Sequence, residues 1–272
     1  MPIFSTIRVF FGSPQKNSAE VPKISADNTR YKFTGECIEH EGHTLWQVHF
    51  LENAVSGGWI EHECNLSYFG TCFLSADSKI YDNGRVEADA FVTNGSEIYH
   101  NALIRGNCIV EGGHIYNDAR VEGSAKISGG LVSGTSIISG GEVSDKAIVT
   151  GKALIKGGYV SSCTLCDNAI ILSGVVYGGI VNGNAVITGD TVMADGCVSG
   201  DAVVSGGEIS GDAWIHGNAQ VSGGTITGGT IYGDAKVSGG TVSGGEILGN
   251  ALVLGGEVLG GIINGDAVIK GR

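Results

Sequence analysis

Aliphatic residues recur at steps of five or six residues through most of the chain. In the stretch VSGDAVVSGGEISGDAWIHGNAQVSGG, which runs from Val198 to Gly224, they stand at Val204, Ile209, Ile215 and Val221. A helix would repeat its apolar positions every three or four residues. Strands of two or three residues that are joined by glycine corners fit steps of five and six instead. The pattern therefore predicts a chain of very short strands.

A longer period groups these strands in threes. An alanine that usually follows Asp or Asn marks it, and Ala202, Ala219 and Ala235 are 17 and 16 residues apart. The complete series, in which Ser136 takes one place, is Ala102, Ala119, Ser136, Ala153, Ala169, Ala185, Ala202, Ala219, Ala235, Ala251 and Ala267. Three strands and three corners per period predict an all-β, single-stranded parallel β-helix. This three-sided solenoid takes 16–17 residues per coil, and each coil pairs only with its neighbours.

The residue before the alanine is expected to form a structural ladder of its own. Its later members alternate between amide and carboxylate: Asn184, Asp201, Asn218, Asp234, Asn250 and Asp266. Coils lie about 4.8 Å apart, so stacked carboxylates would repel, whereas an amide can donate a hydrogen bond to a carboxylate. A metal-binding or catalytic row of carboxylates is the alternative, but Asp and Asn are also ordinary corner residues.

Composition divides the chain in two. All three prolines lie at or before Pro22, and 41 of the 47 glycines follow residue 76. We therefore assign residues 1–76 to an N-terminal β-strand cap and residues 77–272 to the β-helix repeat domain. Residues 31–51 read as two strands joined by a turn at 41–43, and Ile3–Phe11 reads as a further strand.

Two resemblances add to this prediction. The step ISGDAWI (Ile209 to Ile215) resembles the hexapeptide repeat of left-handed β-helix proteins, which favours a left-handed coil, although the five-residue steps depart from that repeat. The segment from Ser56 to Glu61, with Asn65 to Ser67 and Tyr81 to Asn83, resembles the YdcK-like proteins of bacteria and phages. This resemblance covers residues 31–272. It implies a capped β-helix and the label of a hexapeptide-type acyltransferase.

Catalysis is not favoured by the residues themselves. The resemblance to hexapeptide acyltransferases implies a histidine base, a loop excursion from the coil and often a C-terminal helix. The repeats contain His100, His114 and His216, which we interpret as surface histidines. The regular interval of 16–17 residues between repeats leaves no room for a long loop. We assign no catalytic residue, metal site or cofactor. An acyltransferase with a site at a subunit boundary remains the alternative.

One outward row indicates an interface. In each coil one residue lies between the repeating alanine and the next inward aliphatic residue. This residue must point out of the coil, because strand side chains alternate. Large aliphatic residues occupy this position at Leu103, Ile137, Leu154, Ile170, Val186 and Val203. An outward apolar stripe usually marks a contact surface. We expect a second copy of the chain or another protein to cover it, with the N-terminal segment as the alternative occupant.

Charge and cysteine content limit the partners and the compartment. The formal charge of −12 argues against binding to nucleic acid or to anionic membranes. An acidic mimic of DNA is a second alternative function. It would require the acids to gather on one face, because the charge density of the rod is low. Residues 157–272 carry about one net negative charge per ~4.8 Å of the rod axis, whereas duplex DNA carries one per ~1.7 Å of its helix axis.

Seven scattered cysteines and no recognisable export signal predict free thiols in the cytoplasm. We interpret the pair Cys163 and Cys166 as structural, because no second ligand pair lies nearby.

The last coil raises a related expectation. The strands of the final repeat offer unpaired edges, so the coil either docks end to end with another copy or is protected by Lys270 and Arg272.

Overall fold

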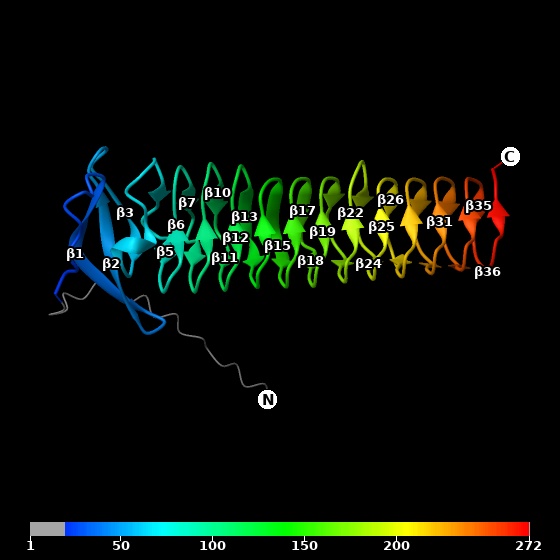
Figure 1. Ribbon diagram of the computed structural model, residues 1–272, viewed down its shortest axis with the longest axis horizontal. Coiled ribbons are helices and arrows are strands. Elements are labelled where there is room, and N and C mark those ends of the chain that lie inside the picture. The colour runs from blue at the N-terminus through cyan, green and yellow to red at the C-terminus, as the bar shows by residue number, and fades with distance from the viewer. Residues whose placement is uncertain (1–19, 272) are drawn as a thin grey trace, which may run out of the picture.

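A computed structural model describes residues 20–271 as a straight rod of stacked coils with a small β cap at one end (Figure 1). The strand expected at Ile3–Phe11 lies outside the described residues. The cap contains β1 (Tyr31–His40), β2 (His43–Phe50) and β3 (Val55–Ile60), followed by a 3-10 turn at Glu63–Asn65. Every later element of the described chain is a strand, and the strands of successive coils pair in parallel over about 12 turns. The prediction of an all-β parallel β-helix is confirmed.

The strand that follows the repeating alanine forms one side of the rod, which we call the alanine face. This 12-stranded sheet consists of β6 (Arg85–Val86), β9 (Leu103–Ile104), β12 (Arg120–Val121), β14 (Ile137–Ile138), β16 (Leu154–Ile155), β19 (Ile170–Ile171), β22 (Val186–Ile187), β25 (Val203–Val204), β28 (Gln220–Val221), β31 (Lys236–Val237), β34 (Leu252–Val253) and β37 (Val268–Ile269).

The other two sides share one 25-stranded sheet with the cap, because β13 (Lys126–Val132) and β15 (Glu142–Val149) contribute to both of them. The second face holds β4 (Phe73–Leu74), β7 (Phe91–Thr93), β10 (Ile109–Glu111), β17 (Tyr159–Ser161), β20 (Val175–Val176), β23 (Val192–Met193), β26 (Glu208–Ile209), β29 (Thr225–Ile226), β32 (Thr241–Val242) and β35 (Glu257–Val258). The third face holds β5 (Lys79–Ile80), β8 (Glu97–Ile98), β11 (His114–Ile115), β18 (Thr164–Leu165), β21 (Ile180–Val181), β24 (Cys197–Val198), β27 (Trp214–Ile215), β30 (Thr230–Ile231), β33 (Glu246–Ile247) and β36 (Ile262–Ile263).

The core is a stack of small and branched side chains. Ala202 and Ala219 are fully buried, as are the aliphatic residues Val204 and Ile209. Ser136, which replaces the alanine in one coil, is also fully buried, and its hydroxyl donates a 2.7 Å hydrogen bond to the carbonyl of Ser133. That bond explains how one coil tolerates a polar atom where its neighbours have a methyl group.

Glycine is favoured at one corner of the coil. Gly200 has a φ of +68°, and a Cβ atom on it would lie 2.8 Å from the backbone nitrogen of Gly217 in the next coil. The equivalent corners near the cap have the same left-handed conformation without glycine, with φ values of 54° at Asp82, 55° at His100 and 59° at Asn117. This conformation is unfavourable for L-residues, although Asp and Asn tolerate it best.

The third cap strand connects the cap to the coils. β3 pairs antiparallel with β2 and parallel with β5, so the coil ladder reaches back to Trp59, within the segment assigned to the cap from composition. Asn65 is buried, and its amide donates hydrogen bonds to the carbonyls of Asp82 and Gly84. The residues that resemble the YdcK-like pattern therefore include those that join the cap to the first coils. The left-handed sense of the coil stays a prediction.

We expect Gly200→Ala to lower the free energy of unfolding by about 2 kcal/mol or more, because the new Cβ meets left-handed strain and the backbone of the next coil. Chemical denaturation followed by circular dichroism measures this change. Gly260→Ala is the matched control, since a Cβ atom on Gly260 would meet no atom within 4 Å and its φ is not left-handed. Equal loss of stability in both variants would contradict the corner argument.

Candidate functional site

The alanine face carries a continuous apolar row on its outside. Strand pairing places Ile137 against Leu154, then Ile170, Val186 and Val203, each in register with the next. These five side chains are half-buried, and we call them the apolar row. Leu103, the sixth residue of the predicted interface, is separated from the row by Arg120. The structure thus brings five of the six residues together and leaves one apart.

Apolar exposure in the same coils extends beyond the alanine face. Ile148 and Ile180 are 40% and 43% exposed on the third face, and Val192 is 38% exposed on the second. Tyr177, at a corner between them, is 52% exposed. The sequence reasoning missed these positions because it followed only the strand after the alanine. The same alternation rule, applied to the other two strands of each coil, would have found Ile148, Ile180 and Val192, but not the corner residue Tyr177.

Side-chain hydrogen bonds join three pairs of neighbours in the predicted Asn and Asp ladder. The amide of Asn184 donates to Asp201 at 2.7 Å, Asn218 to Asp234 at 3.0 Å, and Asn250 to Asp266 at 3.0 Å. Each bond therefore runs from an amide to a carboxylate one coil away. These contacts favour the structural interpretation of the ladder.

Acids do not gather on one side of the rod. Glu208 and Glu257 point outward from the second face, whereas Glu246 points outward from the third. The ladder carboxylates such as Asp201 lie at a corner. A mimic of DNA, which would need a single acidic face, is not favoured by this distribution.

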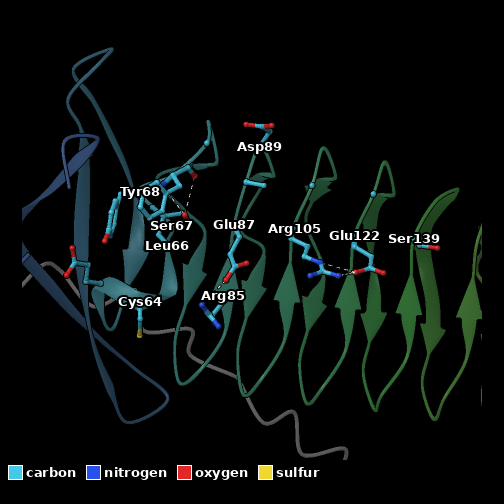
Figure 2. A pocket seen from close by; sticks show the side chains of 16 residues that line it. Cys64, Leu66, Ser67, Tyr68, Arg85, Glu87, Asp89, Arg105, Glu122 and Ser139 are labelled. Atoms are coloured by element: carbon cyan, nitrogen blue, oxygen red, sulfur yellow. Dashed lines mark hydrogen bonds and ion pairs between the residues drawn. The ribbon is translucent and has the colours of Figure 1, made fainter. Parts of the chain in front are cut away.

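A groove of about 990 Å³ lies where the cap overhangs the first coils, along a corner of the alanine face (Figure 2). The loop from Leu66 to Gly70 forms one wall and carries Phe69, which is 72% exposed. Along the other wall Arg85 contacts Glu87 at 2.8 Å and Arg105 contacts Glu122 at 2.7 Å. Both arginines of the groove are thus already paired with carboxylates.

The histidines of the repeats are held by neighbours in the coil. His100 Nδ1 lies 3.0 Å from Asn117 Oδ1, and His216 stacks on Tyr232 with ring centroids 5.1 Å apart. Burial lowers the pKa of His216. His114 Nδ1 lies 3.4 Å from Glu97 Oε2, a carboxylate partner that sequence spacing did not suggest, although the two residues pair in register on adjacent coils.

A polar cluster at the junction of the cap and the coils escaped the sequence reasoning. Glu97 is contacted by Lys79 Nζ at 2.9 Å and by His40 Nε2 at 3.2 Å. Beside it, His43 Nδ1 lies 3.1 Å from Glu61 Oε1. The hydrogen bond to Glu61 raises the pKa of His43, although partial burial opposes it.

The carboxyl groups of the cluster are held ionised. Partial burial tends to raise the pKa of Glu61, but hydrogen bonds from His43 and from the backbone of Asp82 outweigh it and leave that pKa lowered. The pKa of Glu97 is likewise lowered by Lys79 against the effect of burial. Within the described part of the chain, the group that could hold a metal ion is His43, Glu61 and Asp82, whose ligand atoms lie within 4.8 Å of one another.

The cysteines form no disulfide, and all seven lie in the described part of the chain. Burial raises the pKa of the Cys163 thiol to about 12. Burial also raises the pKa of Cys166, which is half-buried. A thiol that stays protonated is a poor nucleophile and a poor metal ligand. These environments favour the structural interpretation of this pair.

Comparison of the chain with models of known protein families and with curated protein sequences gives no match. Among the described residues, no helix is long and apolar enough to cross a membrane.

We expect Asn184→Asp to destabilise the coil by about 1 kcal/mol, because it removes a hydrogen-bond donor and sets two carboxylates against each other. Thermal unfolding at low and high salt measures the effect, which added salt should reduce.

The control for this substitution is Asp201→Asn. It should be tolerated, since Asn168 already donates to the amide oxygen of Asn184 at 2.8 Å. Unchanged stability of Asn184→Asp at low salt would show that the ladder contributes nothing.

Proposed function

We propose that the protein is a non-catalytic β-helical scaffold that assembles with copies of itself through the alanine face. The apolar row from Ile137 to Val203 is the observation that carries this proposal. It crosses five consecutive coils without a charge and with its members in register. Charged and polar residues border it at Arg120, Gln220 and Lys236 on the same face.

A second copy of the chain is the occupant that fits this surface best. Four steps of about 4.8 Å give the row a length of about 19 Å, and an identical row has the same spacing, so side chains of two copies can interdigitate. A two-fold contact of this kind uses the same patch on both subunits. The net charge of −12 would otherwise keep copies apart, but the row itself carries no charge to repel.

Seven cysteines outside any disulfide suit a reducing compartment such as the cytoplasm.

The alternative is a YdcK-like, hexapeptide-type acyltransferase with a site at a subunit boundary. Its acyl donor would carry phosphates, which need free arginine or lysine groups for recognition. In the groove beside the cap, Arg85 and Arg105 are both paired with glutamates. The regular coils of the described chain also carry no long loop that could shape a donor site. These features favour the scaffold over the enzyme.

We expect the purified protein to form dimers or larger assemblies, and Ile170→Asp to convert them into monomers, because the substitution buries a charge in the contact. Light scattering coupled to size-exclusion chromatography measures the molecular mass. Thr225→Asp is the matched control, since Thr225 points outward from the second face and is equally half-buried. It should leave the assembly intact.

Two kinds of result would overturn the proposal. The first is a monomeric wild-type protein, or an Ile170→Asp variant that assembles as the wild type does. The second is a clear rise in melting temperature with acetyl-coenzyme A, which would favour the acyltransferase, because a ligand that binds only the folded state stabilises it.

A further inference from the structure

Three segments that are distant in the sequence meet at the junction of the cap and the first coils. His43 opens β2 directly after the hairpin turn, Glu61 follows the end of β3, and Asp82 occupies the left-handed corner after β5. Each side of the imidazole ring faces a carboxylate. His43 Nδ1 lies 3.1 Å from Glu61 Oε1, and His43 Nε2 lies 3.6 Å from Asp82 Oδ1.

Backbone groups orient both carboxylates. The backbone nitrogen of Asp82 donates to Glu61 Oε2 at 2.7 Å, and the backbone nitrogen of His100 donates to Asp82 Oδ2 at 3.2 Å. These bonds occupy one oxygen of each carboxylate, and the other oxygen, Oε1 of Glu61 or Oδ1 of Asp82, is the one that lies against His43. Hydrogen bonds from neighbouring protein groups to a ligating side chain fix its orientation toward the metal.

Stacked aromatic rings hold the imidazole in place. The His43 ring packs on Tyr81 with centroids 5.1 Å apart, and Tyr81 is buried and stacked on Tyr99 at 5.0 Å. Tyr99 in turn stacks on Tyr116 in the following coil. The ring is therefore supported by the rod rather than by the hairpin turn alone.

The cluster is accessible and has the charge that a cation needs. The side chains of His43, Glu61 and Asp82 are 27%, 19% and 29% exposed, so an ion can reach them without unfolding. His43 and Asp82 also line an open cleft of about 380 Å³. Two carboxylates beside one imidazole suit a divalent cation, which would displace any proton on the ligating nitrogen of His43.

We propose that His43, Glu61 and Asp82 bind a zinc ion that ties the cap to the first coils. One imidazole nitrogen with two carboxylate oxygens is a donor set that suits zinc, whereas magnesium and calcium prefer oxygen ligands alone. The three ligand atoms lie within 4.8 Å of one another. His62 Nε2 lies 3.7 Å from Glu61 Oε1 but is not part of this group, so three residues of the chain would hold the ion and its fourth position would be open.

The experiment titrates zinc chloride into the full-length protein, freed of metal by chelation, and follows binding by isothermal calorimetry. We expect one ion per chain and a higher melting temperature when zinc is bound, since the ion stabilises only the folded junction. His43→Ala and Asp82→Asn should each weaken binding at least tenfold. Asp82→Asn keeps a residue type that tolerates the left-handed corner, so the fold is preserved.

The neighbouring histidine provides the matched control. His114→Ala should bind zinc as the wild type does, because His114 contacts Glu97 and not the three ligands. Cobalt in place of zinc gives a second readout, and its spectrum should show nitrogen and oxygen ligation. No binding, unchanged binding in His43→Ala, loss of binding in His114→Ala, or a thiolate-to-cobalt absorption band would each overturn the site.

Discussion

The structure depends on one constraint: the backbone of each coil makes most of its hydrogen bonds with the coils beside it. The nitrogen of Val203 donates to the carbonyl of Ala219 at 2.9 Å, and that of Gln220 donates to Ala235 at 2.9 Å. Unpaired backbone groups are costly when buried, so every circuit must close after nearly the same length of chain. The small alanine near the corner, the branched residue beyond it and the glycine turn all follow from that closure. Outward residues take no part in it and are free to carry function.

The sequence predicted the positions that recur in every coil, but it did not predict the side-chain clusters where the cap meets the coils. Each inward aliphatic, each alanine and each ladder amide acts on its equivalent one coil away, so periodicity alone located them. His43 and Glu61 lie outside the repeat, and they meet Asp82, a corner residue of the first coils, because β3 turns from an antiparallel pairing with β2 to a parallel pairing with β5. No periodic pattern encodes that change of direction. The groove under Phe69 was missed for the same reason, because it forms only where the cap overhangs the coils.

The rod separates two kinds of surface along its length. Large aliphatic residues follow one another without interruption on the alanine face of the middle coils. Other exposed apolar side chains, such as Leu259 and Ile262, lie in the last coil. Histidines, carboxylates and stacked tyrosines collect at the junction with the cap, where polar chemistry is available. Because inward aliphatic residues recur in the coils beneath both regions, either surface can vary without altering the fold. An assembly through the middle coils would leave the junctions free at its periphery.

Disulfide trapping tests the stacking of the coils most directly. Thr225 and Thr241 are paired neighbours on the outside of the second face, and Glu257 lies one coil further on. Cysteines placed on adjacent parallel strands lie within the reach of a disulfide, which requires Cα atoms about 4.4–6.8 Å apart, whereas a gap of two coils is about 9.6 Å. Mild oxidation and peptide mass spectrometry should therefore find an intramolecular bridge in Thr225→Cys/Thr241→Cys and none in Thr225→Cys/Glu257→Cys. A bridge in the second variant, or none in the first, would contradict a coil that closes once between Thr225 and Thr241.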